Sequence, residues 1–98
     1  MKITGRVHEV LEPVQGMRKN GDPFVKREFS LAVMREDGLQ DEVAFVALGD
    51  KRVEESNRLT PGALVDVYFS IQSNKHENRY YTQLIMNRLT VYSKTVAD

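Results

Sequence analysis

The sequence predicts an all-β fold in which five strands close into a barrel and one short helix lies between strands three and four. Three observations predict it. Residues 43–48 (VAFVAL) are an unbroken apolar run, too short for a helix and rich in β-branched and aromatic residues. Residues 51–59 hold neither Gly nor Pro and suit about two or three helical turns. The other apolar segments alternate with a period of two, as strands do. This layout is that of the five-stranded OB-fold Greek-key barrel; a helix in another small α+β domain is the alternative.

Residues with turn chemistry bound the helix. Gly49 ends the apolar run, and the Asp50 side chain is expected to accept hydrogen bonds from the first free backbone N–H groups of the helix. Pro61 and Gly62 form a turn, because proline presets φ and glycine accepts positive φ. The helix is expected to plug one open end of the barrel.

Two strands precede the apolar run. Residues 3–11 alternate, and Gly5 within them marks a bend, a bulge or a close backbone approach. Residues 15–23 are predicted to be a loop, because they contain several strand breakers, including an Asn-Gly pair. Residues 24–34 form the second strand. Its core side is expected to carry Val25, Phe29, Leu31 and Val33.

Two long strands follow the helix. Residues 63–73 alternate, with Asp66 and Tyr68 among the outward side chains. Residues 74–78 are predicted to be a polar loop and residues 79–92 the last strand, whose apolar phase shifts at Asn87-Arg88 and so predicts a bulge. The OB-fold domain is therefore expected to span residues 1–92, followed by a flexible tail over residues 93–98.

Composition narrows the class of protein. Ninety-eight residues, 41% of them apolar and 29% charged, suit one small soluble domain. The sequence holds no cysteine, no signal-peptide core and no membrane-spanning apolar run, so a cytoplasmic location is expected. The formal net charge is zero, which argues against binding through bulk positive charge. Residues 1–35 nevertheless hold seven Lys/Arg against four Asp/Glu, whereas residues 36–62 hold three against seven. This favours either one basic face or a surface of mixed charge.

The sequence shows no pattern typical of a catalytic or metal site. His8 and His76 have no partners at the spacing of metal ligands. Neither a glycine-rich phosphate loop nor a nucleophile elbow is present. The carboxylates cluster on polar turns and on the helix rather than among apolar residues that would raise a pKa. We therefore expect a protein that is not an enzyme and that holds no cofactor.

Basic and aromatic side chains on outward faces and loops predict a surface for single-stranded nucleic acid. Proteins that hold single strands line a groove with cations and stack bases on aromatic rings, each stack contributing ~1–3 kcal/mol. The cations are expected to contact phosphates, and Phe24 and Tyr68 to contact bases. The predicted nucleic-acid-binding residues are Arg6, Arg18, Lys19, Phe24, Lys26, Tyr68, Lys75, Arg79 and Tyr80.

Several candidates have a structural alternative. Phe24 covers the rim of the barrel in one interpretation. Tyr80 follows the inward phase of the last strand and belongs to the core in another, with Tyr81 beside it as the other candidate ring. Tyr68 packs against a second subunit in a third, and Arg18 and Lys19 are then ordinary solvated loop charges.

A succession of short motifs resembles a known family. The chain carries, in order, Ile3-Thr4-Gly5-Arg6-Val7, Lys19-Asn20-Gly21, residues 24–29 (FVKREF), Val43-Ala44-Phe45, Gly49-Asp50-Lys51 and Arg79-Tyr80-Tyr81-Thr82. Their order and spacing over residues 1–92 resemble an uncharacterised family of short bacterial OB-fold proteins related to single-stranded DNA-binding protein and primosomal replication protein. The resemblance implies a five-stranded OB barrel, a homodimer or larger homo-oligomer, and binding of single-stranded DNA or RNA.

The chain also departs from that family. Members often carry tryptophan where this chain has Phe24, Leu48 and Tyr80, and this sequence contains no tryptophan. It also lacks the glycine-rich linker and acidic tip of bacterial single-stranded DNA-binding protein. Because smaller rings stack less strongly, we expect weak, sequence-independent binding of single-stranded DNA, a function that belongs to DNA replication. The alternative is an OB-fold protein-interaction or assembly module that does not bind nucleic acid.

Overall fold

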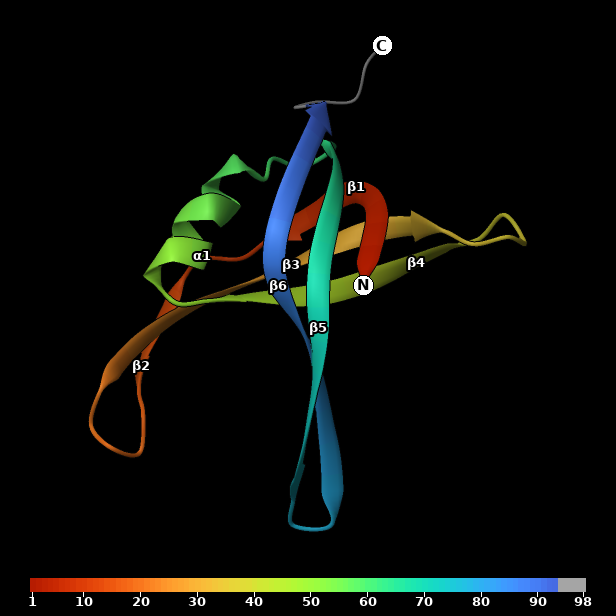
Figure 1. Ribbon diagram of the computed structural model, residues 1–98. Coiled ribbons are helices and arrows are strands. Elements are labelled where there is room, and N and C mark those ends of the chain that lie inside the picture. Colours follow the sequence, from red (N-terminus) through yellow and green to blue (C-terminus); the bar gives the residue numbers. More distant parts are fainter. Residues whose placement is uncertain (94–98) are drawn as a thin grey trace.

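The computed structural model describes residues 1–93 and shows a barrel of strongly curved strands from which hairpins project (Figure 1). Its elements are β1 (Lys2–Val10), β2 (Val14–Met17), β3 (Pro23–Met34), β4 (Gln40–Leu48), α1 (Asp50–Glu55), a 3₁₀ turn (Ser56–Arg58), β5 (Leu64–His76) and β6 (Arg79–Ser93). Five long strands with the helix between the third and the fourth of them confirm the predicted barrel. Of the predicted tail, Ser93 is the last residue of β6, and residues 94–98 lie outside the described residues.

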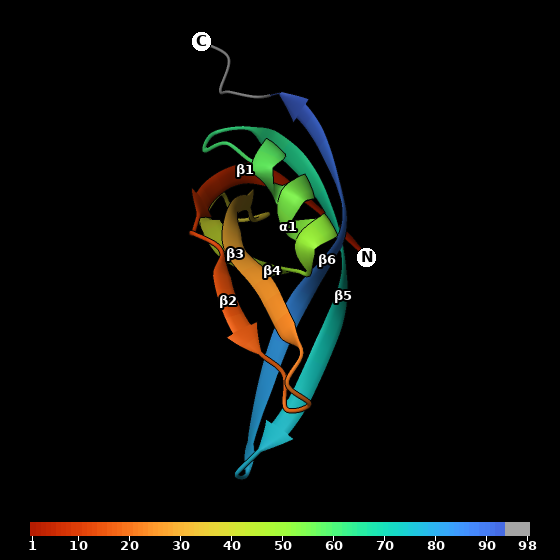
Figure 2. The same cartoon turned by 90° about the vertical axis from the view of Figure 1, so that its left-hand side faces the viewer.

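Long-range pairings close the sheet. The strand order is β1-β5-β6-β4-β3-β2, and β1 also pairs with β3. Every pair is antiparallel except β4 with β6, which are parallel where Val46 meets Ile85. A parallel contact between segments so far apart in sequence requires a crossover, and α1 forms part of it. Figure 2 shows the barrel from the side with α1 across its opening.

Strand β1 belongs to both sides of the barrel because it bends sharply. Lys2–Arg6 pairs with β5, whereas Arg6–Val10 pairs with β3. The register with β3 skips His8, which is therefore a bulge residue. A Cβ atom on Gly5 would lie 2.7 Å from the backbone oxygen of Ala32. The close backbone approach predicted at Gly5 is thus confirmed.

The core fills the barrel with side chains from every long strand. The ring of Phe45 stacks on Phe29 at 5.4 Å between centroids and meets Phe69 edge to face at 5.5 Å. Leu59, which follows the 3₁₀ turn, is also buried in this cluster. The buried cluster comprises Val7, Phe29, Leu31, Phe45, Ala47, Leu59, Ala63, Val65, Val67, Phe69, Met86 and Leu89. Phe29 and Leu31 lie on the predicted core side of their strand, with Val33 partly buried beside them.

The helix is shorter than predicted and is capped differently. It begins at Asp50 and ends at Glu55, and a single 3₁₀ turn follows. Asp50 is the first helical residue rather than the cap; Gly49 takes the cap position with φ of 88°. A glycine is needed there because side chains disfavour positive φ. The Glu55 carboxylate accepts the backbone N–H of Leu89 at 3.0 Å and so ties the helix end to β6.

Two hairpins differ from the predicted loops. Residues 15–23 were expected to be a loop, but Val14–Met17 forms β2 and pairs with Pro23–Lys26. Residues 74–78 were also expected to be a loop, but β5 and β6 continue to a two-residue turn at Glu77 (φ 49°) and Asn78 (φ 64°). Two successive positive φ values are typical of the type I′ hairpin turn.

The bulge predicted at Asn87-Arg88 is confirmed. Tyr68 opposes Arg88, and the next residue, Phe69, opposes Met86, so Asn87 is left out of the register. A tight turn joins β3 to β4, in which Gly38 has φ of 87° and its N–H donates to the Arg35 carbonyl at 3.0 Å.

Candidate nucleic-acid interface

An open groove lies between the β3–β4 surface and β6. Its volume is about 460 Å³. Glu28 of β3 and Ala44 and Val46 of β4 line one wall, and residues 80–84 of β6 line the other. The segment 71–84 continues past the barrel as a two-stranded arm, which we call the β5–β6 arm (Figure 1). The groove therefore forms where this arm leaves the barrel.

One face of the arm carries an exposed ring and a cation. Tyr80 lies directly opposite Lys75 in the hairpin, and the Lys75 ammonium is 5.7 Å from the centre of the Tyr80 ring. The alternative that Tyr80 belongs to the core is wrong, since 74% of Tyr80 is exposed. Its inward phase continues into a part of the arm that lies beyond the barrel, where there is no core to enter.

The other face of the arm repeats this chemistry, and its ring, Tyr81, also lines the groove. The Arg79 guanidinium lies 5.9 Å from the centre of the Tyr81 ring. Tyr81 pairs with Asn74, one position along from the Lys75–Tyr80 pair, and so points to the other face of the hairpin. Arg79 therefore stands on the arm with Lys75 and Tyr80, but on the face that carries Tyr81.

A second cation–aromatic pair lies on the hairpin formed by β2 and β3, which we call the β2–β3 hairpin. The Arg18 guanidinium is 5.9 Å from the centre of the Phe24 ring. Phe24 pairs across the strands with Gly16, and a Cβ atom on Gly16 would lie 2.6 Å from the ring. Phe24 is half-buried because its ring covers this glycine. It is thus both a cover for the hairpin and a partly exposed ring.

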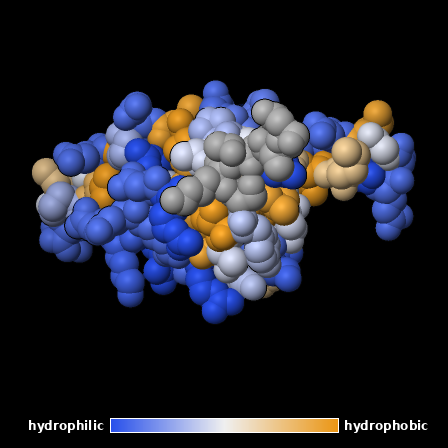
Figure 3. Space-filling view, turned by 90° about the horizontal axis from the view of Figure 1, so that it is seen from above, coloured by the Kyte–Doolittle hydropathy of each residue, from blue (hydrophilic) through white to orange (hydrophobic). Residues whose placement is uncertain are grey.

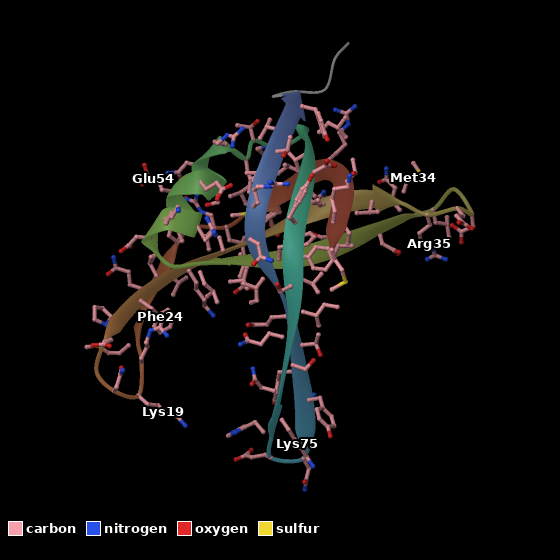
Figure 4. The ribbon with its side chains drawn as sticks, viewed as in Figure 1. Lys19, Phe24, Met34, Arg35, Glu54 and Lys75 are labelled. Atoms are coloured by element: carbon pink, nitrogen blue, oxygen red, sulfur yellow. The ribbon has the colours of Figure 1, made fainter. Side chains whose placement is uncertain are left out.

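Lys19 and Lys26 flank that pair. Lys19 is exposed beside a tight turn in which the Asp22 N–H donates to the Asn20 side-chain oxygen at 3.1 Å. Lys26 is half-buried and pairs with Leu48 of β4. Figure 4 shows Lys19 near the end of the β2–β3 hairpin and Lys75 near the end of the β5–β6 arm. Both hairpins project from the same end of the barrel in Figures 1 and 2.

Two predicted residues lie elsewhere. The Arg6 guanidinium donates to the backbone oxygen of Gly62 at 3.3 Å, at the bend where β1 passes from β5 to β3. Tyr68 lies on the outer face of β1, β5 and β6. Its ring centre is 4.1 Å from the Arg88 guanidinium and 6.0 Å from the Lys2 ammonium. The structure therefore does not bring Arg6 and Tyr68 together with the two hairpins.

Next to Tyr68, the predicted outward residue Asp66 is covered, with 1% of it exposed. The hydroxyls of Thr4 and Tyr92 donate to its carboxylate, and the Lys2 ammonium is 3.8 Å away. The hydrogen bond from Thr4, then that from Tyr92, lowers the pKa of Asp66 despite its partial desolvation. The same bond to Asp66 raises the pKa of Tyr92. This network joins three strands and has a structural role.

The wall formed by β3 and β4 is not basic. Glu28 lines the groove. Glu42 lies further along the same outer face, where it accepts the Ser30 hydroxyl at 2.8 Å and lies 3.7 Å from the His8 imidazole. Positive charge therefore stands at the two hairpins, and acidic and apolar side chains stand between them. Phosphates are best accommodated at the hairpins, away from the two carboxylates.

Comparison with known proteins agrees with this architecture. Residues 2–90 match the family model described as Domain of unknown function (DUF3127). The chain belongs to this family. No curated protein matches the sequence.

Solved structures similar to this DUF3127 chain include single-stranded DNA binding proteins. The mitochondrial single-stranded DNA binding protein Rim1 from S. cerevisiae superposes with a TM-score of 0.66 at 19% identity, covering 95% of this chain and 94% of that chain. The N-terminal domain of PriB from Thermoanaerobacter tencongensis, solved as a dimeric structure, gives 0.64 at 16% identity, covering 94% of this chain and 93% of that chain. These similarities show that the DUF3127 domain has the OB fold.

Two features of the DUF3127 site were not predicted. The first is β2, which brings Gly16 under Phe24. The second is that the Arg79 guanidinium lies beside the Tyr81 ring, on the other face of the arm from Lys75 and Tyr80. The alternation of residues 79–84 was visible in the sequence, but the length of the arm depends on a turn of two non-glycine residues with positive φ, which has no strong sequence signal. Within residues 1–93 there is no group of metal-ligating side chains and no helix long and apolar enough to cross a membrane.

Proposed function

We propose that this DUF3127 protein is a non-enzymatic protein that binds single-stranded DNA or RNA, weakly and without sequence preference. The strand lies across the groove from the β5–β6 arm to the β2–β3 hairpin. The observation that carries the proposal is the pairing of a cation with an exposed or half-exposed ring on each of these hairpins. Such pairs combine phosphate attraction with a stacking surface, the two contributions that single-strand binding uses.

Each predicted residue near the groove contacts either a base or a phosphate of the strand. Tyr80 and Phe24 stack bases, while the cations beside them contact phosphates. These cations are Arg18, Lys19, Lys26, Lys75 and Arg79. Arg6 and Tyr68 take no part in this path, because they lie on other sides of the barrel. A cytoplasmic protein that acts where single strands are exposed, as in DNA replication, fits this role.

A titration tests the proposal directly. A fluorescein-labelled oligothymidine of roughly 16 nucleotides, the upper site size for one OB fold, is titrated with protein at low salt and followed by fluorescence anisotropy. We expect saturable binding that weakens as salt rises, because the strand releases counterions on binding. A flat titration up to high micromolar protein would contradict the proposal. A duplex of the same length serves as the control and is expected to bind less.

One observation favours a second candidate, a protein-interaction module. Tyr68, with Arg88 and Lys2 beside it, forms a cation-flanked aromatic surface on the side of the barrel away from the groove. Exposed aromatic and arginine side chains are enriched at protein interfaces. We propose that this side pairs two subunits in a homo-oligomer. A Tyr68→Glu variant that keeps the mass of the wild-type particle in light scattering would count against it.

A further inference from the structure

The two ends of the long β3–β4 ribbon carry opposite charge. At one end, residues 14–27 of the β2–β3 hairpin hold four basic side chains and one acidic side chain. At the other, residues 34–42 of the β3–β4 hairpin hold four acidic side chains and one basic side chain. The formal net charge of zero therefore conceals a charge separation along one direction of the molecule. Figure 1 shows the two hairpins projecting on opposite sides of the barrel.

The acidic end also presents apolar side chains. Met34 and Leu39 are 63% and 60% exposed, one on each side of the turn. Arg35, the basic residue of this hairpin, lies 2.6 Å from the Asp37 carboxylate and 3.4 Å from that of Asp41. Its charge is thereby neutralised within the hairpin, and the excess is negative. Figure 3 shows the apolar side chains at the projecting right-hand end of the molecule.

The basic end presents the complementary surface. Val14 and Met17 of β2 are 56% and 70% exposed. Arg18 and Lys19 are exposed directly after them in the chain. Exposed apolar side chains and cations thus stand together at one end of the ribbon, and exposed apolar side chains and carboxylates at the other. The two match in both polarity and charge, the combination that selects one docking orientation over others.

We propose that a second copy of this chain docks head to tail, with its β3–β4 hairpin on the β2–β3 hairpin of the first. Because the two surfaces are different and lie at opposite ends, the contact is heterologous and leaves one free end of each kind. Copies therefore add into a ring or an open row. This association is separate from the pairing through Tyr68 and is sensitive to salt.

The contact has a consequence for strand binding, which rests on the proposed function. Arg18 and Lys19 contact either the carboxylates of a neighbouring copy or the phosphates of a bound strand. Head-to-tail association and strand binding at this hairpin therefore compete. Adding single-stranded DNA is expected to dissociate the head-to-tail assembly. Raising the protein concentration is expected to weaken the binding of single-stranded DNA by each protomer.

Charge-swap variants test the docking independently of DNA. Sedimentation velocity at low salt is expected to show association of the wild type that disappears at high salt, where the screening length falls to ~3 Å at 1 M. Arg18→Glu/Lys19→Glu and Glu36→Lys/Asp41→Lys each place like charges at the contact and are each expected to abolish it. An equimolar mixture of the two variants restores one wild-type contact, and a single chain with all four changes restores complementarity. Both are expected to associate again.

A charge swap on the β5–β6 arm is the matched control for the docking. Lys75→Glu/Arg79→Glu makes the same change in charge on the β5–β6 arm and is expected to leave the association unchanged while weakening strand binding. Wild type that gives the same mass at low and high salt overturns the docking, as does a mixture that fails to associate. An oligothymidine titration on the same samples shows which proposal fails. If the wild type associates with itself but does not bind oligothymidine, only the proposed function and the competition are contradicted.

Discussion

The β5–β6 arm and the β2–β3 hairpin present the same chemistry in different settings. On the arm, the Tyr80 ring is largely exposed and packs on little besides its neighbouring lysine. On the hairpin, the Phe24 ring covers Gly16 and is half-buried. One ring is free to stack, whereas the other must stack while it also supports its own hairpin. Strand binding by the Tyr80 ring is therefore independent of the stability of the arm, whereas the Phe24 ring contributes both to strand binding and to the stability of its hairpin.

The largest effect is expected from Phe24→Ala, which removes both roles of the ring. Loss of one stack contributes ~1–3 kcal/mol, or roughly 5- to 150-fold weaker strand binding. Loss of a half-buried aromatic cover is expected to lower the free energy of unfolding by about 1 kcal/mol. Anisotropy titration and urea unfolding measure the two effects. Phe24→Leu is the matched control, because it keeps an apolar cover without an aromatic face. If both variants bind like the wild type, Phe24 is not a stacking surface.

Tyr80→Ala is expected to affect binding alone. The loss of strand affinity falls in the same range, ~1–3 kcal/mol, whereas the free energy of unfolding changes by less than about 0.5 kcal/mol because the side chain is exposed. The same two measurements apply, with Gln72→Ala, an exposed residue of the arm that does not line the groove, as the control. A large loss of stability in Tyr80→Ala would show that the arm is not the free platform that its exposure indicates.

Smaller effects are expected from the cations, and these compare the two hairpins directly. Lys19→Ala and Lys75→Ala each remove one phosphate contact. Each is expected to reduce the slope of log affinity against log salt by about 0.7. Titrations at several salt concentrations give the slope. If Lys75→Ala changes it and Lys19→Ala does not, the strand follows the arm only.

The smallest effect on binding is expected from acid titration of Asp66, which lies away from both hairpins. Its folded pKa is lowered, so its stabilising contribution is present above the unfolded pKa of about 3.9 and is lost as the pH falls through the folded value. Unfolding midpoints in urea between pH 3 and 6 are expected to drop at the acid end. Asp66→Asn is expected to flatten that drop and to leave strand affinity at neutral pH unchanged. An equal drop in both proteins would mean that other carboxylates control acid stability.

Most of the fold was predictable, because it depends on local patterns. Alternation placed Phe29 and Leu31 in the core, and the change of phase located the bulge at Asn87. Strand β2 was missed because four residues that include a glycine carry no independent strand signal. The strand exists because β3 offers it a partner, which is a tertiary interaction that overrides local propensity.

The site was only partly predictable. Sequence alternation identifies which side chains face outward but not which side of a closed barrel they share. Arg18, Lys19, Phe24, Lys75 and Tyr80 lie on two hairpins at the same end of the barrel, whereas Arg6 and Tyr68 lie elsewhere. Tyr80 has the phase of a core residue and is exposed because the arm extends beyond the barrel.

The amino-acid sequence by itself determined the five long strands, their inward faces and the helix after Gly49, because each depends on neighbours within a few residues. Tertiary structure decided the formation of β2, the length of the β5–β6 arm and the separation of Tyr68 from Phe24. These depend on pairings such as β1 with β3 and β4 with β6, which join segments far apart in the chain. Once these pairings close the barrel, they decide which outward side chains lie near one another on its surface.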